Sequence, residues 1–86
     1  MEANLDDTLA EREARYGDFT DHACISQAIL HYLMSGRSWA MMRPAHKEAL
    51  TIIAHKMARI VNGDPNYGDS WHDIAGYATL AEQRCK

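Results

Sequence analysis

The stretch PAHKEALTIIAHKMARIVNG (residues 44–63) sets the expected fold class of this chain. Its apolar side chains recur every three or four residues, which is the spacing of one face of an α-helix. Proline suits the first helical position, and Asn62 or Gly63 can end the helix in a left-handed conformation. We therefore predict a long helix from Pro44 to about Val61. Its expected inward stripe consists of Leu50, Ile53, Ala54, Met57, Ile60 and Val61.

The sequence on either side predicts three more helices and no strand. We expect them at residues 5–15, 22–35 and 71–84, each opened by a residue type that caps helices. Gly17, between the first two, can take a positive φ. The expected capping residues are Asn4 or Asp6, then Thr20 or Asp21, then Asp69 or Ser70.

A single all-α domain over residues 1–86, a compact bundle of about four helices, is therefore predicted. A chain of this length buries only about 60–65% of the surface that its unfolded form exposes. Homo-oligomerisation would add burial that one copy lacks, so we expect a homo-oligomer. Whether residues 39–42 pack in the core or at an interface stays open at this point.

Composition narrows the classes of partner and cofactor. The formal net charge of −3 argues against nucleic-acid binding, which usually requires a basic patch. Two cysteines do not make a disulfide scaffold, and we expect both to pack within helices. No apolar run reaches the ~20 residues that a membrane span needs, so a cytoplasmic protein without a membrane partner is expected. The five histidines lack zinc-ligand spacing, and no zinc is expected.

Polar side chains on the long helix form a candidate ligand site. Glu48, His55, Arg59 and Asn62 fall near one helical face, and Arg59 can hold a phosphate through two hydrogen bonds. The alternative is an ordinary solvated face with ion pairs. The full set of expected ligand-binding residues is His55, Lys56, Arg59, Asn62, Tyr67 and Trp71.

Two carboxylates one helical turn apart, Asp69 and Asp73, form a candidate Mg²⁺ site. Asp64 on the loop, or Glu48 on the neighbouring helix, can complete the set of ligands, and the metal would then position a pyrophosphate. The alternative is structural, because Asp69 can cap the last helix and Asp73 suits its first turn. The turns at Tyr16-Gly17-Asp18 and Tyr67-Gly68-Asp69 also repeat one pattern, from either turn-and-cap chemistry or two helix entrances that line one site.

Two blocks, RYGDFTDH (residues 15–22) and NGDPNYGDSWHDIAGY (residues 62–77), resemble a family of small phage and prophage proteins of unknown function. That resemblance covers most of the chain and implies a bacterial cytoplasm. A more distant similarity is to the all-α MazG-like nucleotide pyrophosphohydrolases, which hold Mg²⁺ with acidic residues on two helices. It implies that Asp73, Asp69 and Glu48 are the acidic residues, but Thr51 and Ile52 stand where a second glutamate would be.

Three hypotheses on function follow. In the first, the protein binds a phosphorylated nucleotide, or hydrolyses its pyrophosphate with Mg²⁺. In the second, it is a phage counter-defence or host-takeover protein that binds a host protein or sequesters a nucleotide signal. In the third, it is a structural or assembly protein. The missing second glutamate favours binding over catalysis.

Overall fold

A computed structural model describes residues 4–86 and confirms the all-helical class. Within those residues there is no strand. The elements are α1 (Leu5–Tyr16), α2 (Phe19–Met34), a single 3₁₀ turn η1 (Trp39–Met41), α3 (Pro44–Asn62) and α4 (Gly68–Glu82). No helix in the described part of the chain is long and apolar enough to cross a membrane.

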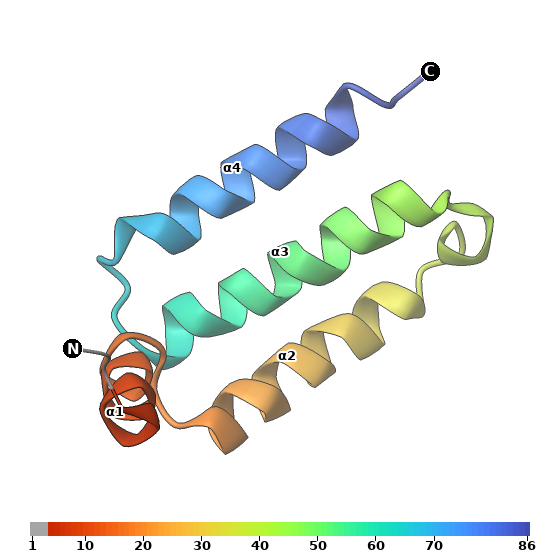
Figure 1. Ribbon diagram of the computed structural model, residues 1–86. Coiled ribbons are helices and arrows are strands. Elements are labelled where there is room, and N and C mark those ends of the chain that lie inside the picture. The colour runs from red at the N-terminus through yellow and green to blue at the C-terminus, as the bar shows by residue number, and fades with distance from the viewer. Residues whose placement is uncertain (1–3) are drawn as a thin grey trace.

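Helices α2, α3 and α4 lie side by side as one layer, and α1 crosses one end of it (Figure 1). Helix α3 is in the middle and packs against both neighbours. The molecule is consequently elongated, with extents of 47 × 25 × 22 Å. Helix α3 has neighbours on two sides only, and α1 covers just one end of the layer, so most of both faces is uncovered in one chain.

The core is small and centred on α3. Its buried apolar residues are Ala49, Ala54, Ala58 and Ile60, and the small alanines let the helices approach closely. Met57 and Val61, which we predicted to face inward, are 40% and 71% exposed. That part of the prediction is wrong for one chain, because neither α2 nor α4 covers this side of α3.

Two helices begin earlier than their sequence signals suggest. Asp18, and not Thr20 or Asp21, caps α2 by accepting a hydrogen bond from the Asp21 backbone N–H at 3.1 Å. Helix α4 begins at Gly68 without a side-chain cap, so the predicted cap at Asp69 or Ser70 is also wrong. Asn4 caps α1 as predicted, because its side chain accepts from the Asp7 N–H.

The α1–α2 and α3–α4 junctions pack directly on each other. Asn62 Nδ2 donates to the backbone carbonyls of Tyr16 and Asp18, both at 2.9 Å. The backbone N–H of Asp64 donates to the carbonyl of Arg15 at 2.7 Å. Gly17 has the predicted positive φ of 78°, whereas neither Asn62 nor Gly63 is left-handed. These contacts fix the angle at which α1 crosses the layer.

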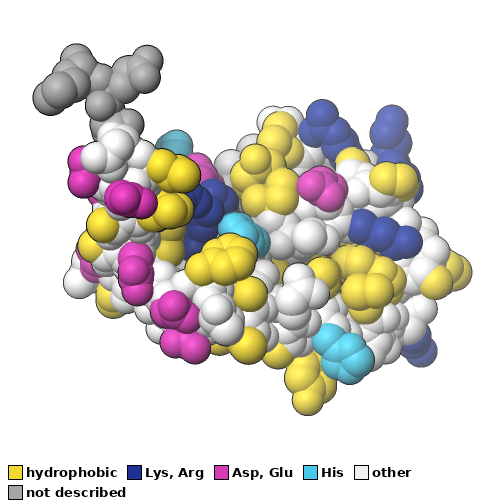
Figure 2. All heavy atoms as spheres, turned by 60° about the horizontal axis from the view of Figure 1, so that its bottom comes forward, with side chains coloured by type: hydrophobic (Ala, Val, Ile, Leu, Met, Phe, Trp, Pro, Cys, Tyr) yellow, Lys and Arg dark blue, Asp and Glu magenta, His cyan; other side chains and the backbone are white. Residues whose placement is uncertain are grey.

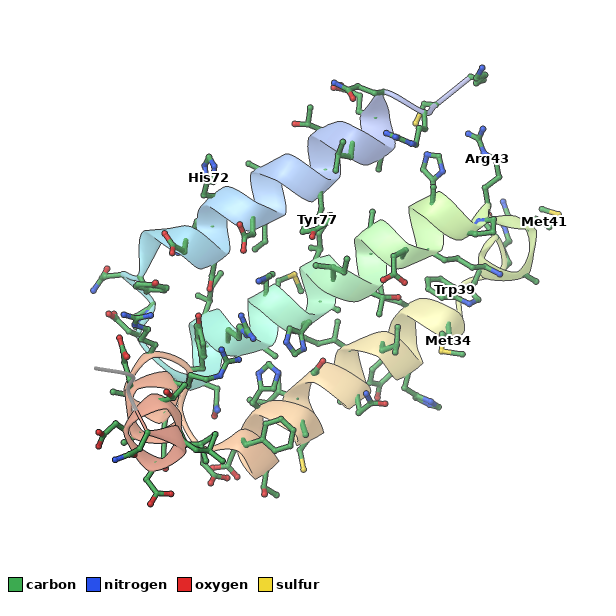
Figure 3. All side chains as sticks on the ribbon, in the orientation of Figure 1. Met34, Trp39, Met41, Arg43, His72 and Tyr77 are labelled. Atoms are coloured by element: carbon green, nitrogen blue, oxygen red, sulfur yellow. The ribbon has the colours of Figure 1, made fainter. Side chains whose placement is uncertain are left out.

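The segment between α2 and α3 is only partly packed. Trp39 is half-buried with Lys47 Nζ 5.7 Å from its ring centroid, whereas Met41 is 82% exposed and points away from the helices (Figure 3). Cys24 and Cys85 are both exposed, so the expectation that they pack within helices is wrong.

Candidate functional site

A cavity of about 400 Å³ lies where α1 crosses the ends of α2 and α3. Figure 2 shows basic (Lys or Arg) and histidine side chains gathered in this hollow beside apolar ones. Helix α1, the turn after it, α2 and α3 all contribute to the wall. The lining residues are Leu9, Arg12, Glu13, Tyr16, Gly17, Asp18, Phe19, His22, His55 and Arg59.

Two arginines in the cavity contact the same aromatic ring. The guanidinium carbons of Arg12 and Arg59 lie 5.3 and 4.1 Å from the centroid of the Tyr16 ring. Within residues 4–86, neither guanidinium lies within 4.0 Å of a carboxylate, since the ion pairs found there are Arg15–Glu11 and Lys56–Asp73. Stacking orients a guanidinium without using its N–H donors. Both arginines therefore keep donors that can bind an anion.

A histidine pair also lines the cavity, and its His55 is one helical turn before Arg59 on α3. His22 Nε2 and His55 Nδ1 are 3.1 Å apart, and the rings meet edge to face. His22 is only 5% exposed, and its Nδ1 is buried without a hydrogen-bond partner. Burial, followed by the charge of Arg59, lowers the pKa of both rings, and that of His55 falls to about 4. At neutral pH the pair is therefore uncharged, with one ring donating to the other.

The stability of the protein is expected to fall as the pH drops from 6.5 towards 4. The pKa of His55 is about 4 in the folded chain and 6.5 for an ordinary histidine, so protonation in this window favours the unfolded state. The midpoint of urea unfolding, followed by circular dichroism, should decrease between these pH values. His55→Gln removes one titrating ring and should flatten the decrease. Equal slopes for the wild type and this variant would contradict the assignment.

Of the predicted ligand-binding residues, the structure brings His55 and Arg59 together in the cavity. Asn62 supports the cavity from outside, because its amide holds the Tyr16 and Asp18 carbonyls of the wall. Lys56 lies elsewhere and pairs with Asp73 of α4 at 2.9 Å.

Two predicted aromatic residues also lie outside the cavity. Tyr67 packs edge-on against Tyr16, with ring centroids 6.2 Å apart, and its hydroxyl donates to Asp69. Trp71 is 56% exposed, and its ring N–H donates to the Pro65 carbonyl. The two similar Tyr-Gly-Asp turns thus meet through their tyrosines, but only the first one lines the cavity.

The structure does not assemble Glu48, Asp69 and Asp73 into a metal site within one chain. Lys56 donates to Asp73 and holds the pKa of that carboxyl below its usual value. Asp69 accepts the Tyr67 hydroxyl, and Glu48 lines a separate hollow between α3 and α4. Among residues 4–86, no three His, Cys, Asp or Glu side chains are placed to hold a metal ion. The α4 surface that turns towards α3 carries Tyr77, whereas His72 points away (Figure 3).

Eight of the ten lining residues are absent from the predicted set, among them Arg12, Tyr16, Phe19 and His22. Tyr16, Phe19 and His22 stand in or beside the repeated Tyr-Gly-Asp turn, which is the one sequence signal that points to them. Arg12 is one helical turn before Tyr16, so both project from the same face of α1. The histidines have no zinc spacing, and their direct contact depends on how α2 packs on α3.

A comparison with protein families gives one match, which spans residues 3–85 and is described as a domain of unknown function, DUF6378. The chain belongs to the DUF6378 family. The match includes every residue of the cavity and both junctions, so the site lies within the DUF6378 domain. No curated protein and no solved structure matches the chain.

Proposed function

We propose that this protein binds a phosphorylated nucleotide in the cavity between α1, α2 and α3. The observation that carries the proposal is the placement of Arg12 and Arg59 against Tyr16, in a cavity of about 400 Å³. Small-molecule sites have volumes of roughly 300–1,000 Å³ and combine an apolar lining with a few convergent polar groups. This cavity has both properties.

The phosphate end of the ligand fits the arginine pair. Guanidinium groups match phosphate oxygens through paired hydrogen bonds, and two of them offset most of the charge of a phosphomonoester. When His22 Nε2–H donates to His55 Nδ1, the Nε2–H of His55 remains as one donor without a further charge. Glu13 also lines the cavity, and its carboxylate suits a ligand hydroxyl or amino group more than a phosphate.

The nucleobase of the proposed ligand fits the apolar side of the cavity. Phe19 lines it and is 78% exposed. Leu9 of α1 lines the same cavity and is 54% exposed. An aromatic ring with a free face can stack on a nucleobase, and such stacking contributes roughly 1–3 kcal/mol. A ligand with both a planar base and a phosphate would contact both the apolar side chains and the arginine pair.

Binding without turnover is the form of the proposal that the geometry favours. Hydrolysis of a pyrophosphate with Mg²⁺ requires carboxylates gathered around the metal, and Asp73 instead holds Lys56. The similarity to MazG-like enzymes supports a nucleotide as the ligand class. The resemblance of residues 15–22 and 62–77 to phage and prophage proteins supports sequestration of a nucleotide signal in the bacterial cytoplasm as the biological role.

A thermal-shift screen tests the proposal. The melting temperature should rise with at least one member of a panel of nucleoside phosphates and cyclic oligonucleotides. A ligand at 100 times its dissociation constant stabilises the folded state by about 2.7 kcal/mol. Chromatography of the same mixtures, with and without Mg²⁺, should show the ligand intact. No shift with any nucleotide contradicts the proposal, and conversion of the ligand contradicts its non-catalytic form.

A further inference from the structure

Helix α3 also carries a stripe of apolar side chains that no other helix within residues 4–86 covers. Val61 is four residues after Met57, and Leu50 is seven residues before it, so the three project from one side of the helix. Val61 is 71% exposed and Met57 40%. Arg59 is two residues from Met57, about 200° around the helix, so the stripe faces away from the cavity.

Helix α4 adds an aromatic side chain to the same side. Leu80 of α4 and Glu48 of α3 both line the hollow between these two helices. Their side chains therefore lie on the same face of the layer. Trp71 is nine residues before Leu80, so its side chain points about 180° away from that of Leu80. Met57 is nine residues after Glu48, so it likewise points about 180° away from Glu48. Trp71 and Met57 therefore share the opposite face. We call this the open face and define it by Leu50, Met57, Val61 and Trp71.

The four residues that define the open face are uncharged, and three of them are at least 40% exposed. Trp71 and Val61 alone are 56% and 71% exposed. Soluble proteins seldom leave contiguous apolar side chains uncovered, and such patches mark interaction sites. The matching stripe on the cavity side of α3 carries Glu48, His55 and Arg59 instead. On α3 itself the two faces thus differ in chemistry, and the exposed apolar side chains on the cavity side, Leu9, Phe19 and Leu80, come from the other helices.

The chain exposes more surface than a folded monomer of its mass normally does. The chain exposes 6405 Å², whereas a folded monomer of 9.7 kDa exposes about 5,100 Å². The excess is larger than the ~800 Å² that each partner contributes to a standard protein–protein interface. Among residues 4–86, no large side chain is fully buried. One chain therefore lacks a core of ordinary size, and a dimer interface would supply the difference.

We propose that a second copy of this chain packs on the open face. The apolar surface that one chain leaves exposed belongs to α3, its central helix, so a partner has to cover it whenever the chain folds. A second copy is always present, and a two-fold axis lets the same uncharged patch cover itself. Interfaces of obligate homodimers are apolar in this way and resemble a domain core cut in half. Because the cavity faces the other side, the dimer leaves both ligand sites accessible.

Sedimentation equilibrium of the full chain tests the proposal. The wild type should have about twice the 9.7 kDa mass of one chain, and its melting temperature should rise over a hundredfold increase in concentration. Val61→Glu and Met57→Glu should halve the mass or, where the monomer does not fold, abolish the helical circular dichroism. Met41→Glu is the matched control, because Met41 is 82% exposed on η1, and it should stay dimeric.

Two results would overturn the proposal. One is a wild type that is monomeric and fully helical with a melting temperature independent of concentration. The other is a dimer that survives both Val61→Glu and Met57→Glu. The ligand site is tested separately, because Arg59→Met should leave the mass unchanged while it affects the nucleotide site. Failure of the dimer and failure of nucleotide binding are therefore distinguishable.

Discussion

Gly17→Ala is expected to lower the free energy of unfolding by about 2–5 kcal/mol. Gly17 has a φ of 78°, which an L-residue with a Cβ seldom adopts, and the added carbon would overlap the backbone carbonyl of Asn62. Backbone atoms cannot rotate away from such a contact, so the two junctions would have to separate. Urea unfolding followed by circular dichroism, at one protein concentration, measures the effect.

Gly76→Ala is the matched control for this substitution. Gly76 is inside α4, and a Cβ there would meet no atom within 4 Å. Alanine has a higher helix propensity than glycine, so this variant should be more stable by up to about 1 kcal/mol. Gly63→Ala should behave like Gly17→Ala, because its Cβ would overlap the Arg15 carbonyl. A Gly17→Ala variant as stable as the wild type would contradict the packing of the junctions.

Arg59→Met is expected to reduce nucleotide affinity tenfold to about a hundredfold, the loss of one or two hydrogen bonds to a charged group. Methionine keeps much of the side-chain volume but removes every donor. Arg59→Lys should recover only part of the affinity, because an ammonium group cannot form the paired contact of a guanidinium. Isothermal titration calorimetry with the best ligand of the thermal-shift screen measures all three proteins.

The control for the arginine variants is Arg37→Met, since Arg37 is exposed and lies outside the cavity. It removes the same charge and should leave the affinity unchanged. If Arg37→Met and Arg59→Met weakened binding equally, the ligand would sense only the net charge of the protein. The proposed contact between Arg59 and phosphate would then be wrong.

The helices were predictable because their signals are local. The α3 stripe, the proline at its start and the Asn4 cap all act within a few residues, and each of these elements is present. The start of α2 was missed because Asp18, Thr20 and Asp21 are all residue types that cap helices, and only the packed structure selects Asp18. The exposure of Val61 was missed for a related reason, since periodicity identifies an apolar face but not how many neighbours cover it.

The site was predictable in part. His55 and Arg59 share a face of one helix, so their spacing alone places them together. The partners of Asp73 and Lys56 depend on which side of α4 meets α3, and the structure pairs these two residues with each other. Arg12 and His22 reach the cavity from two further helices through the contact between the junctions. That contact is long-range, and no local pattern specifies it.

Helix α1 has no buried residue, and its packing is confined to the end next to Gly17. Elements with so few buried contacts have the lowest free energy of local unfolding in a protein. A ligand that bridges Arg12 on α1 and Arg59 on α3 would therefore act as a cross-link between the least and the most firmly held helices. Occupancy of the cavity would slow the opening of its own wall, so the release of a bound nucleotide would depend on the detachment of α1.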